Sequence, residues 1–368
     1  MKTTILTLIF FSSISCIYGK EVNIDGKIDN LKNTLVFLKM RSQNSIDIID
    51  SVFVVNEKFQ FKLINKELAI YFISIPTFKI TIAFIPERSI EITGNANSIG
   101  SLLVKGSFET NVYNKWNQQT REFGFQWIRV SGEKQKYLEQ KDTLSANKLN
   151  ILLDSLKKEY DNNDFFMIET YPKTYTALFV LSKIYLNLSF KKFKEYLMLI
   201  KQKSKNHPLY NILKSKYTIL KKTQIGVSAP KFSIESLNSK DIIDLSKINS
   251  QYVLLDFWGS WCGPCIKSIP DIKRIFKSYK NDFLQIISIA FDDINDKEKL
   301  NDLIEKNKME WVHGFININD KNNPVIVDYS VISFPTYILI GPDRKILFRD
   351  NGTANFDILE KILKDKLN

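Results

Sequence analysis

A pair of cysteines at the start of a predicted helix constrains the fold of this sequence more than any other feature. Residues 261–265 read WCGPC; they follow an apolar run at 252–258 and precede a helical pattern. A CxxC motif placed where a strand passes into a helix is typical of a thiol–disulfide exchange site. A second feature is the segment SFPT at 333–336, which opens another predicted strand. Its proline, Pro335, lies 73 residues after Cys262 (335 − 262 = 73). The two features together are far more specific than either alone.

The length and composition predict two or three globular domains. The chain has 368 residues, and 44% of them are apolar, which is enough for each domain to bury a core. The net charge is +12 and the pI is about 9.3. The lysines are spread along the whole chain, without an arginine-rich block or a nucleic-acid motif. We therefore expect no nucleic-acid partner.

The first residues, 1–19, are predicted to be an export signal. Lys2 supplies a positive start, and the apolar run at 5–11 is too short to span a bilayer. We expect cleavage after Gly19. The alternative is cleavage before Cys16, which would then carry a lipid, but the residues before it fit a lipoprotein signal poorly. The expected location is therefore the periplasm or cell envelope.

The cysteine count indicates that the pair is used for chemistry. The sequence has three cysteines, Cys16, Cys262 and Cys265, so a chain cleaved after residue 19 keeps only the pair. An exported protein that has one vicinal pair and no other disulfide is expected to use it in exchange reactions. The alternatives are a closed structural bridge or half of a zinc site. Zinc needs about four ligands, and the chain has only two histidines and no second CxxC. We expect no metal and no cofactor.

The segment 20–107 is predicted to be a small antiparallel β domain, a sandwich or a barrel. Polar and apolar residues alternate at 58–63, as in a half-buried strand. Two further runs, 80–85 and 90–93, flank the turn signal at 86–88 and predict a hairpin. Nothing in this segment indicates catalysis, so a binding or spacing role is expected.

The segment 108–224 is predicted to be helical. Apolar residues recur at spacings of three and four, and such stripes are more often core than cofactor pocket. The clearest stripes are Leu149, Leu152, Leu153, Leu156 and Tyr160, and Tyr175, Leu178, Leu181 and Tyr185. A homodimer formed through this region is left open.

The segment 225–368 is predicted to alternate strands and helices, the pattern of an α/β sheet. The turn signal at 341–344 predicts that the last two strands form an antiparallel hairpin. The expected strands are 252–258, 284–291, 336–340 and 345–349, and the expected helices are 265–280, 296–307 and 355–366.

The chemistry of exchange assigns different roles to the two cysteines. The thiolate is the nucleophile, and a free cysteine with a pKa of about 8.5 is mostly protonated at neutral pH. We expect Cys262 at the N-terminus of a helix that begins around Cys265, where backbone N–H groups favour a negative sulfur. Cys265 is expected to be covered and to resolve the mixed disulfide. Asp256 interrupts an apolar strand and is expected to be the buried proton acceptor; the alternative is a carboxylate that faces solvent at the strand end.

The same residues resemble the thioredoxin superfamily. The match comprises Asp256, the WCGPC segment, Pro270 and the FPT segment at 334–336. Together with the opening at 226–230, it looks like the TlpA/ResA-like thiol–disulfide reductases of bacterial envelopes and covers about 226–368. The segment at about 20–110 is similar to a β domain of unknown function that often precedes such domains.

The resemblance implies a role for each matching residue. It makes Cys262 the nucleophile, Cys265 the resolving thiol and Asp256 the buried proton carrier. It implies a cis peptide bond before Pro335, where the preceding backbone aligns a substrate. The sequence departs from the TlpA/ResA-like pattern at Ser268, three residues after Cys265, where many relatives carry glutamate. The residues expected to contact substrate are Trp261, Gly263, Pro264, Phe334 and Pro335.

We therefore expect an exported oxidoreductase that reduces disulfides in envelope proteins. Gly263-Pro264 is also the dipeptide of thioredoxin, which implies a reduction potential of about −270 mV. Keeping such a pair reduced outside the cell requires a membrane thiol electron donor. The alternatives are a disulfide oxidase or isomerase on the same scaffold, and an envelope binding protein with an accessory redox domain. The sequence does not identify the substrate, the donor or the direction of transfer.

Overall fold

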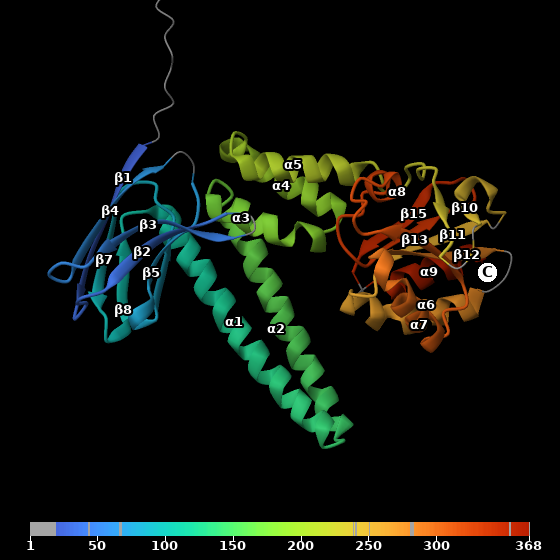
Figure 1. The fold of residues 1–368 in the computed structure, drawn as a ribbon, viewed down its shortest axis with the longest axis horizontal. Helices are drawn as coiled ribbons and strands as arrows, with labels where there is room; N and C mark the ends of the chain where they lie inside the picture. The colour runs from blue at the N-terminus through green and yellow to red at the C-terminus, as the bar shows by residue number, and fades with distance from the viewer. Residues whose placement is uncertain are drawn as a thin grey trace, which may run out of the picture. The chain divides into compact units, whose positions relative to one another are not determined.

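The computed structural model describes residues 20–42, 45–65, 68–237, 239, 241–249, 251–279, 283–352 and 355–367. The predicted export signal and Cys16 lie outside these residues. The described residues divide into two compact units, one formed by those up to 180 with 202–207 and the other by 181–201 with those from 208 onwards. The expected order of a β domain, a helical middle region and a C-terminal α/β domain is confirmed (Figure 1).

The β part of the first unit is a sandwich of two four-stranded sheets, ordered β4-β1-β7-β8 and β3-β2-β5-β6. Alternate residues point to opposite faces of a strand, so the alternating segment at 58–63 sends Phe59, Phe61 and Leu63 into the shared core. The elements are β1 (Lys20–Asp29), β2 (Leu35–Arg41), β3 (Ile46–Phe53), β4 (Lys58–Asn65), β5 (Tyr71–Ile75), the 3-10 turn η1 (Pro76–Phe78), β6 (Ile80–Phe84), β7 (Ile90–Asn95) and β8 (Ser98–Lys105).

The hairpin predicted around residues 86–88 is wrong. β6 pairs with β5 in one sheet, whereas β7 pairs with β1 and β8 in the other. β7 runs parallel to β1, so the β domain is not antiparallel throughout, in contrast to the prediction. The connection therefore crosses between the sheets, and apolar residues of both strands enter the same core. The backbone of Ile85 bonds to side chains of the following helix instead of a partner strand: its N–H donates to Thr110 Oγ1 at 3.0 Å, and its carbonyl accepts from Ser107 Oγ at 2.6 Å.

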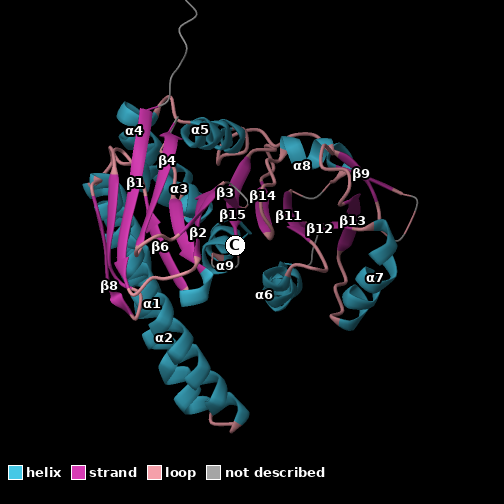
Figure 2. Cartoon of the chain, turned by 60° about the vertical axis from the view of Figure 1, so that its left-hand side comes forward, coloured by secondary structure: helices cyan, strands magenta, loops and turns pink. Residues whose placement is uncertain are grey.

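The middle region is helical, as predicted. α1 (Phe108–Glu139) and α2 (Thr143–Thr170) form an antiparallel hairpin (Figures 1 and 2). Ser107 caps α1, and Trp116 Nε1 donates to Asp164 Oδ1 at 2.7 Å across the two helices. None of the helices among the described residues is long and apolar enough to cross a bilayer. The remaining elements are α3 (Tyr175–Ile184), η2 (Tyr185–Asn187), α4 (Phe190–Ser204) and α5 (Pro208–Lys221).

The second unit contains a five-stranded sheet ordered β13-β12-β11-β14-β15. β11, β12 and β13 are parallel, and β14 and β15 are antiparallel, so the hairpin predicted at 341–344 is confirmed. The elements are β9 (Ser233–Glu235), β10 (Ile242–Asp244), η3 (Leu245–Lys247), β11 (Tyr252–Trp258), α6 (Gly263–Tyr279), β12 (Leu284–Asp292), η4 (Ile294–Asp296), α7 (Lys297–Lys306), β13 (Val312–Asn317), α8 (Pro324–Asp328), β14 (Thr336–Ile340), β15 (Ile346–Asn351) and α9 (Phe356–Leu367).

The central strand β11 is buried on both faces, as expected for a strand in the middle of a covered sheet. Leu254 and Trp258 belong to the core that α6, α7 and α9 cover, whereas Leu255 and Phe257 belong to the core on the α8 side. Because side chains alternate along a strand, Asp256 points to the same side as Leu254 and Trp258. That core also contains both cysteines of the pair.

Candidate active site

The cysteine pair lies at the N-terminal end of α6. Cys262 and Cys265 form a disulfide, and the backbone N–H of Cys265 donates to Cys262 Sγ at 3.2 Å. The helix begins at Gly263, two residues earlier than predicted. The physical reason is Pro264, whose restricted φ angle suits the first turn of a helix, where an N–H has no partner to lose. Cys262 therefore immediately precedes the helix, where a negative sulfur is stabilised.

The two cysteines do not differ in exposure. Cys262 is 4% exposed and Cys265 is 3% exposed, so the expected contrast between a reachable and a covered cysteine is not seen in the oxidised pair. What distinguishes them is position, since Cys265 is inside the helix and Cys262 precedes it. Trp261 is 52% exposed, and Gly263 and Pro264 between the cysteines are exposed as well.

The loop before Cys262 is held by Asp292, a residue that the sequence analysis missed. Ser260 donates twice to this carboxylate, from its N–H to Oδ2 at 2.7 Å and from its Oγ to Oδ1 at 2.8 Å. Asp292 is fully buried at the end of β12, and burial raises the pKa of its carboxyl. A signal existed in the sequence: Asp292 ends an apolar strand parallel to β11, and parallel neighbours end at the same sheet edge.

The indole of Trp261 is oriented by a hydrogen bond to the end of β12. Its Nε1 donates to the carbonyl of Phe291 at 2.9 Å. The ring lies so close to Gly259 that an added Cβ there would be 2.6 Å from Trp261 Nε1, so only glycine fits this position. The Trp261 and Phe334 rings meet edge to face with their centroids 5.4 Å apart, and Phe334 stacks on Phe291 at 5.4 Å. These three aromatic rings form one continuous cluster next to the cysteine pair.

The expected cis peptide bond is present between Phe334 and Pro335. The following residue, Thr336, begins β14 and pairs with Phe257 near the C-terminal end of β11. The cis bond therefore lies at the same end of β11 as the loop that leads to Cys262. The structure thus brings the two sequence features together at one edge of the sheet.

Asp256 is buried, as predicted, with 5% of its surface exposed. Burial raises the pKa of its carboxyl from 3.8 to about 7, and a hydrogen bond from Ser288 Oγ to Oδ2, 2.6 Å long, opposes part of this rise. Ser288 in turn accepts a hydrogen bond from Trp311 Nε1 at 2.8 Å. Since Trp311 can only donate, the Ser288 proton is directed to Asp256. A carboxyl with this pKa exchanges protons near neutral pH.

Ser268, the departure from the family pattern, takes part in a buried hydrogen-bonded pair. Its Oγ donates to the carbonyl of Cys265 at 2.7 Å and lies 2.5 Å from the hydroxyl of Tyr337. A hydroxyl has one proton, and the carbonyl can only accept, so Tyr337 is the donor to Ser268. Tyr337 pairs with Asp256 in the β11–β14 register. Burial, followed by the negative charge of Asp256, raises the pKa of Tyr337, which keeps the phenol neutral.

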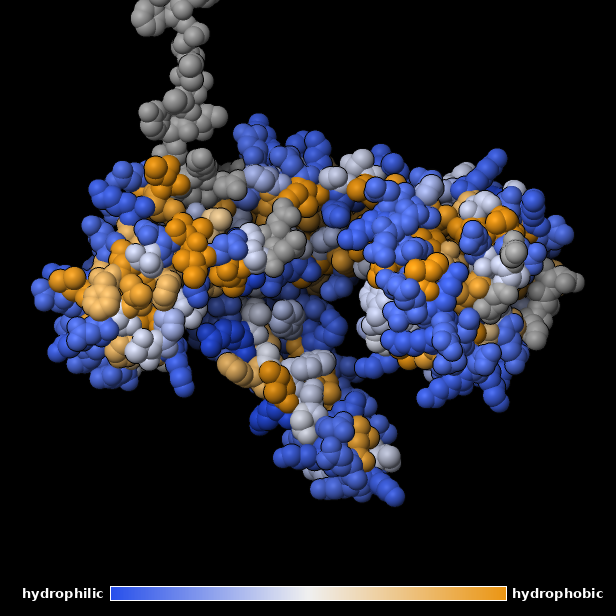
Figure 3. Space-filling model, in the orientation of Figure 1, coloured by the Kyte–Doolittle hydropathy of each residue, from blue (hydrophilic) through white to orange (hydrophobic). Residues whose placement is uncertain are grey.

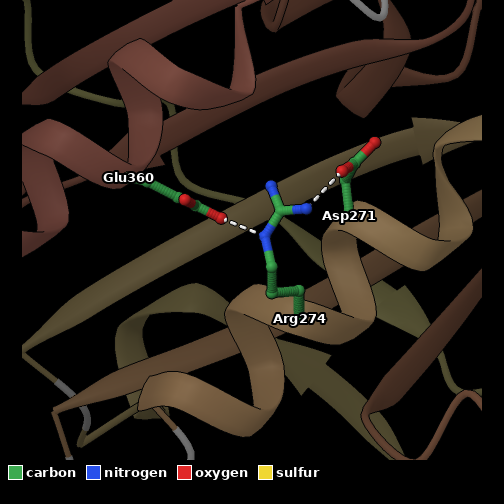
Figure 4. A network of polar contacts seen from close by, with 3 residues as sticks. All are labelled: Asp271, Arg274 and Glu360. Atoms are coloured by element: carbon green, nitrogen blue, oxygen red, sulfur yellow. Dashed lines mark hydrogen bonds and ion pairs between the residues drawn. The ribbon is translucent and has the colours of Figure 1, made fainter.

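Helix α6 is also anchored beyond the motif (Figure 4). Arg274 Nε donates to Glu360 on α9 at 2.7 Å, and its Nη1 donates to Asp271 on α6 at 2.8 Å. All three side chains are partly exposed, so the ion pairs contribute little energy individually. They link α6 to α9 through side chains near the surface.

Metal-ligating side chains and the buried His313 do not extend the site. Among the residues that the structure describes, no group of three or more His, Cys, Asp or Glu side chains is arranged to hold a metal ion. His313 is buried on β13, and its Nε2 lies 3.0 Å from the carbonyl of Met309. The arrangement at the start of α6 therefore offers sulfur chemistry: a cysteine pair at a helix N-terminus and a buried carboxyl that titrates near pH 7.

Comparison with known proteins extends this picture. Residues 249–346 match a family model described as thioredoxin-like, and residues 22–113 match a domain of unknown function (DUF4369). A thiol-disulfide oxidoreductase ResA from Bacillus thuringiensis subsp. konkukian is 31% identical over 156 residues, which are 42% of this chain and 86% of that protein. ResA from Bacillus subtilis is 30% identical over 39% of this chain and 74% of its own length. A solved thiol-disulfide oxidoreductase from Bacteroides fragilis is 31% identical, with 37% and 99% of the two chains covered and a TM-score of 0.33.

Proposed function

Through its C-terminal part this chain belongs to the thioredoxin-like thiol–disulfide oxidoreductases, and from that premise we propose that it reduces disulfides in other proteins with the dithiol of Cys262 and Cys265. The observation that carries the proposal is the hydrogen bond from the Cys265 N–H to Cys262 Sγ at the start of α6. A backbone donor and a helix N-terminus both stabilise a thiolate, the form of cysteine that attacks a disulfide.

In the first step the reduced enzyme attacks its substrate. The Cys262 thiolate attacks one sulfur of the substrate disulfide. A bond forms between Cys262 and that sulfur, the substrate S–S bond breaks, and the departing sulfur leaves as a thiolate that takes a proton from water. The product is a mixed disulfide between enzyme and substrate.

In the second step Cys265 resolves the mixed disulfide. Its S–H gives a proton to the Asp256 carboxylate, and the resulting thiolate attacks Cys262. The Cys262–Cys265 bond forms, the mixed disulfide breaks, and the second substrate sulfur leaves reduced. Two electrons have passed from the enzyme dithiol to the substrate disulfide, and the enzyme is left in the oxidised state described above. The pKa of about 7 for Asp256 supports its role as the acceptor, because it can take and return a proton at neutral pH.

Substrate contact is proposed for the aromatic surface beside the pair. Trp261 is exposed and supported by Phe334, so an extended polypeptide that lies across the cis bond before Pro335 would meet both rings. Gly263 has open space where a Cβ would be, and with Pro264 it leaves the approach to Cys262 without bulky side chains.

We also propose that the enzyme works outside the cytoplasm on disulfide-bearing envelope proteins. The leader-like sequence at 1–19 supports export. Each turnover leaves the pair oxidised, so a thiol donor in the membrane must return two electrons. The Gly263-Pro264 dipeptide supports a reducing potential of about −270 mV. Oxidase or isomerase activity on the same scaffold is the alternative.

Two measurements test the proposal. The reduction potential, equilibrated against glutathione, is expected near −270 mV; a value near −120 mV would favour an oxidase. The reduced enzyme is expected to reduce insulin in the presence of dithiothreitol. Its Cys262→Ser variant serves as the matched control and should lose this activity, whereas equal activity of both proteins would refute the assignment of the nucleophile.

A further inference from the structure

The hairpin of α1 and α2 packs through a thin apolar seam towards its tip. The buried residues of this seam are Val130, Leu153 and Leu156, with Phe123 and Leu149 packed partly buried against them. α1 has 32 residues and is therefore about 48 Å long at 1.5 Å per residue. A two-helix element of this length with so few buried side chains gains little from its own packing, since helix stability in water depends mainly on tertiary contacts.

The face of α1 that points away from this seam is also apolar. Phe125 is 64% exposed and Ile128 is 69% exposed, and they lie three residues apart on one side of the helix. Gly124 and Gly132 lie on the same side, and an added Cβ at either would meet no atom within 4 Å. Apolar patches interrupt the polar surface over the two helices (Figure 3). Large exposed apolar side chains that cluster on one helix face mark a contact surface.

Four charged residues flank Phe125 and Ile128 on α1. Arg121 and Glu122 precede them, and Lys136 and Glu139 follow them, so each end of the face has one cation and one anion. The guanidinium of Arg121 lies over the Phe125 ring, 5.9 Å from its centroid. Within the described parts of the chain, none of the four forms an ion pair with another residue. The two glutamates accept instead from glutamines on α1, Glu122 from Gln118 at 3.0 Å and Glu139 from Gln135 at 3.3 Å.

We propose that this face of α1 binds the same face of a second copy of the chain, with the helices antiparallel and a two-fold axis beside Ile128. Glu122 lies six residues before the centre (128 − 122 = 6), and Lys136 lies eight after it (136 − 128 = 8). In the antiparallel arrangement these two residues of opposite copies are offset by about 3 Å along the axis. Arg121 and Glu139 are similarly offset by about 6 Å, within the reach of two long side chains.

The charges at the two ends of the face favour a second copy over an unrelated partner. Each end is complementary to the other end of the same face, and a two-fold axis uses every such pair twice. Arg129, next to Ile128, would face its own copy across the axis, and this like-charged contact weakens the dimer. Ile128 then meets Ile128 of the second copy at the centre, and the adjacent glycines let the backbones approach closely. Stable interfaces bury roughly 1,200–2,000 Å² of surface, and this face is too small to bury that area. We therefore expect a reversible dimer with a dissociation constant in the micromolar range.

Sedimentation velocity of the oxidised chain from Lys20 onwards, at about 1 to 100 µM, tests the proposal. The wild type is expected to pass from monomer to dimer over this range. Ile128→Glu places a charge against its own copy at the centre and should raise the dissociation constant at least about tenfold. The matched control is Ile151→Glu on α2, because Ile151 is 76% exposed and lies on the side of α2 turned away from α1. This control should leave the dissociation constant unchanged.

Exchanging the charges of Glu122 and Lys136 tests the proposed antiparallel register of the two α1 helices. This test leaves the apolar residue at the centre, Ile128, unchanged. Glu122→Lys should weaken the dimer about tenfold, because two like-charged contacts replace two ion pairs, and adding Lys136→Glu should restore the affinity. Circular dichroism checks that each variant is folded. A wild type that is monomeric at about 100 µM, a dimer insensitive to Ile128→Glu, equal loss in the Ile151→Glu control, or a double variant without recovery would each overturn the proposal. Redox activity plays no part in this readout, so the outcome is independent of the proposed function.

Discussion

Ser268 on α6 and Tyr337 on β14 share a hydrogen bond of 2.5 Å between their hydroxyl groups. The helix contains Cys265, and the strand begins immediately after Pro335. The bond therefore ties together the two segments that the sequence separates by more than sixty residues (337 − 268 = 69). Both residues are buried, and in such surroundings a satisfied hydrogen bond restricts the geometry of the groups that it joins.

Removal of this bond should loosen the site without unfolding the protein. Tyr337→Phe leaves Ser268 bonded to the Cys265 carbonyl, so we expect a loss of about 1 kcal/mol in the free energy of unfolding. We expect kcat/KM for insulin reduction to fall by about threefold to tenfold. Ser268→Ala and the double variant complete a thermodynamic cycle. If the two single effects simply add, the two hydroxyls do not act as a pair.

Loss of the Asp256 carboxylate should slow the second chemical step. Asp256→Asn removes the proposed proton acceptor, and general bases contribute about 10² to 10⁴ in rate. We expect resolution of a preformed mixed disulfide to slow at least about a hundredfold at pH 7, while formation of the mixed disulfide changes little. Single-turnover mass spectrometry separates the two steps. An equal slowing of both steps would contradict the assignment.

The pH dependence of the same step should follow the titration of Asp256. The carboxylate accepts the proton only when ionised, so in the wild type the resolution rate should rise with pH and level off above about 7. Ser288→Ala removes the hydrogen bond that lowers the pKa of Asp256, and the midpoint should move to higher pH. Trp311→Phe is the control, because Trp311 bonds to Ser288 and not to Asp256. It should move the pH midpoint of the resolution rate by less than Ser288→Ala does. A midpoint that Ser288→Ala leaves in place would argue against Asp256 as the acceptor.

Folding stability should decrease with pH because of the same carboxyl. Its pKa is about 7 in the folded protein, against 3.8 for an ordinary aspartate of an unfolded chain, so between these values only the folded state binds the proton. The Asp256 carboxyl therefore makes its full contribution to the free energy of unfolding below about pH 4. This contribution is lost as the pH rises to 7, by about 1.4 kcal/mol per pH unit and about 4 kcal/mol in total. Asp256→Asn has no carboxyl to titrate at this position, so its free energy of unfolding minus that of the wild type should rise between pH 4 and pH 7. Urea unfolding of the oxidised proteins from pH 5 to 8 measures the difference, and a constant difference would show that Asp256 is not titrating in the folded state.

The hydrogen bonds between Ser260 and Asp292 should position the loop before Cys262. Asp292→Asn replaces one carboxylate oxygen by an NH₂ group, which cannot accept from Ser260. Since hydrogen bonds to charged groups contribute about 1.5–3 kcal/mol, we expect a loss of that size in unfolding free energy. The reduced variant should also react more slowly with iodoacetamide at Cys262. Asp302→Asn removes an exposed carboxylate on α7 and is the matched control, which should leave the alkylation rate unchanged.

The nature of the substrates should be revealed by trapping. Cys265→Ser removes the resolving thiol, so mixed disulfides on Cys262 should accumulate in cells and be released by dithiothreitol. Non-reducing electrophoresis followed by mass spectrometry identifies the trapped proteins. The Cys262→Ser/Cys265→Ser variant controls for disulfides formed elsewhere. An absence of adducts specific to the Cys265→Ser protein would weaken the proposal that Cys262 attacks substrate disulfides.

Sequence patterns by themselves determined the order of the domains, most strands of the α/β sheet, the cysteine motif and the burial of Asp256. These features depend on local periodicity or on short motifs, which a single chain displays directly. The cis bond before Pro335 was expected only from the resemblance to the thioredoxin superfamily. The predicted α/β strands omitted β13, a short strand interrupted by Gly314, and the hairpin prediction around 86–88 failed because a turn signal does not state which sheet the next strand joins.

Only the tertiary structure decided which polar residues surround the pair. Asp292 meets Ser260, Ser288 meets Asp256, and Tyr337 meets Ser268 across sequence separations of 32, 32 and 69 residues. Such contacts arise because strands β12 and β14 pair on either side of β11 while α6 packs against one face of the sheet. The physical reason is that register and side-chain direction result from the packing of the whole core, and no local segment contains that information.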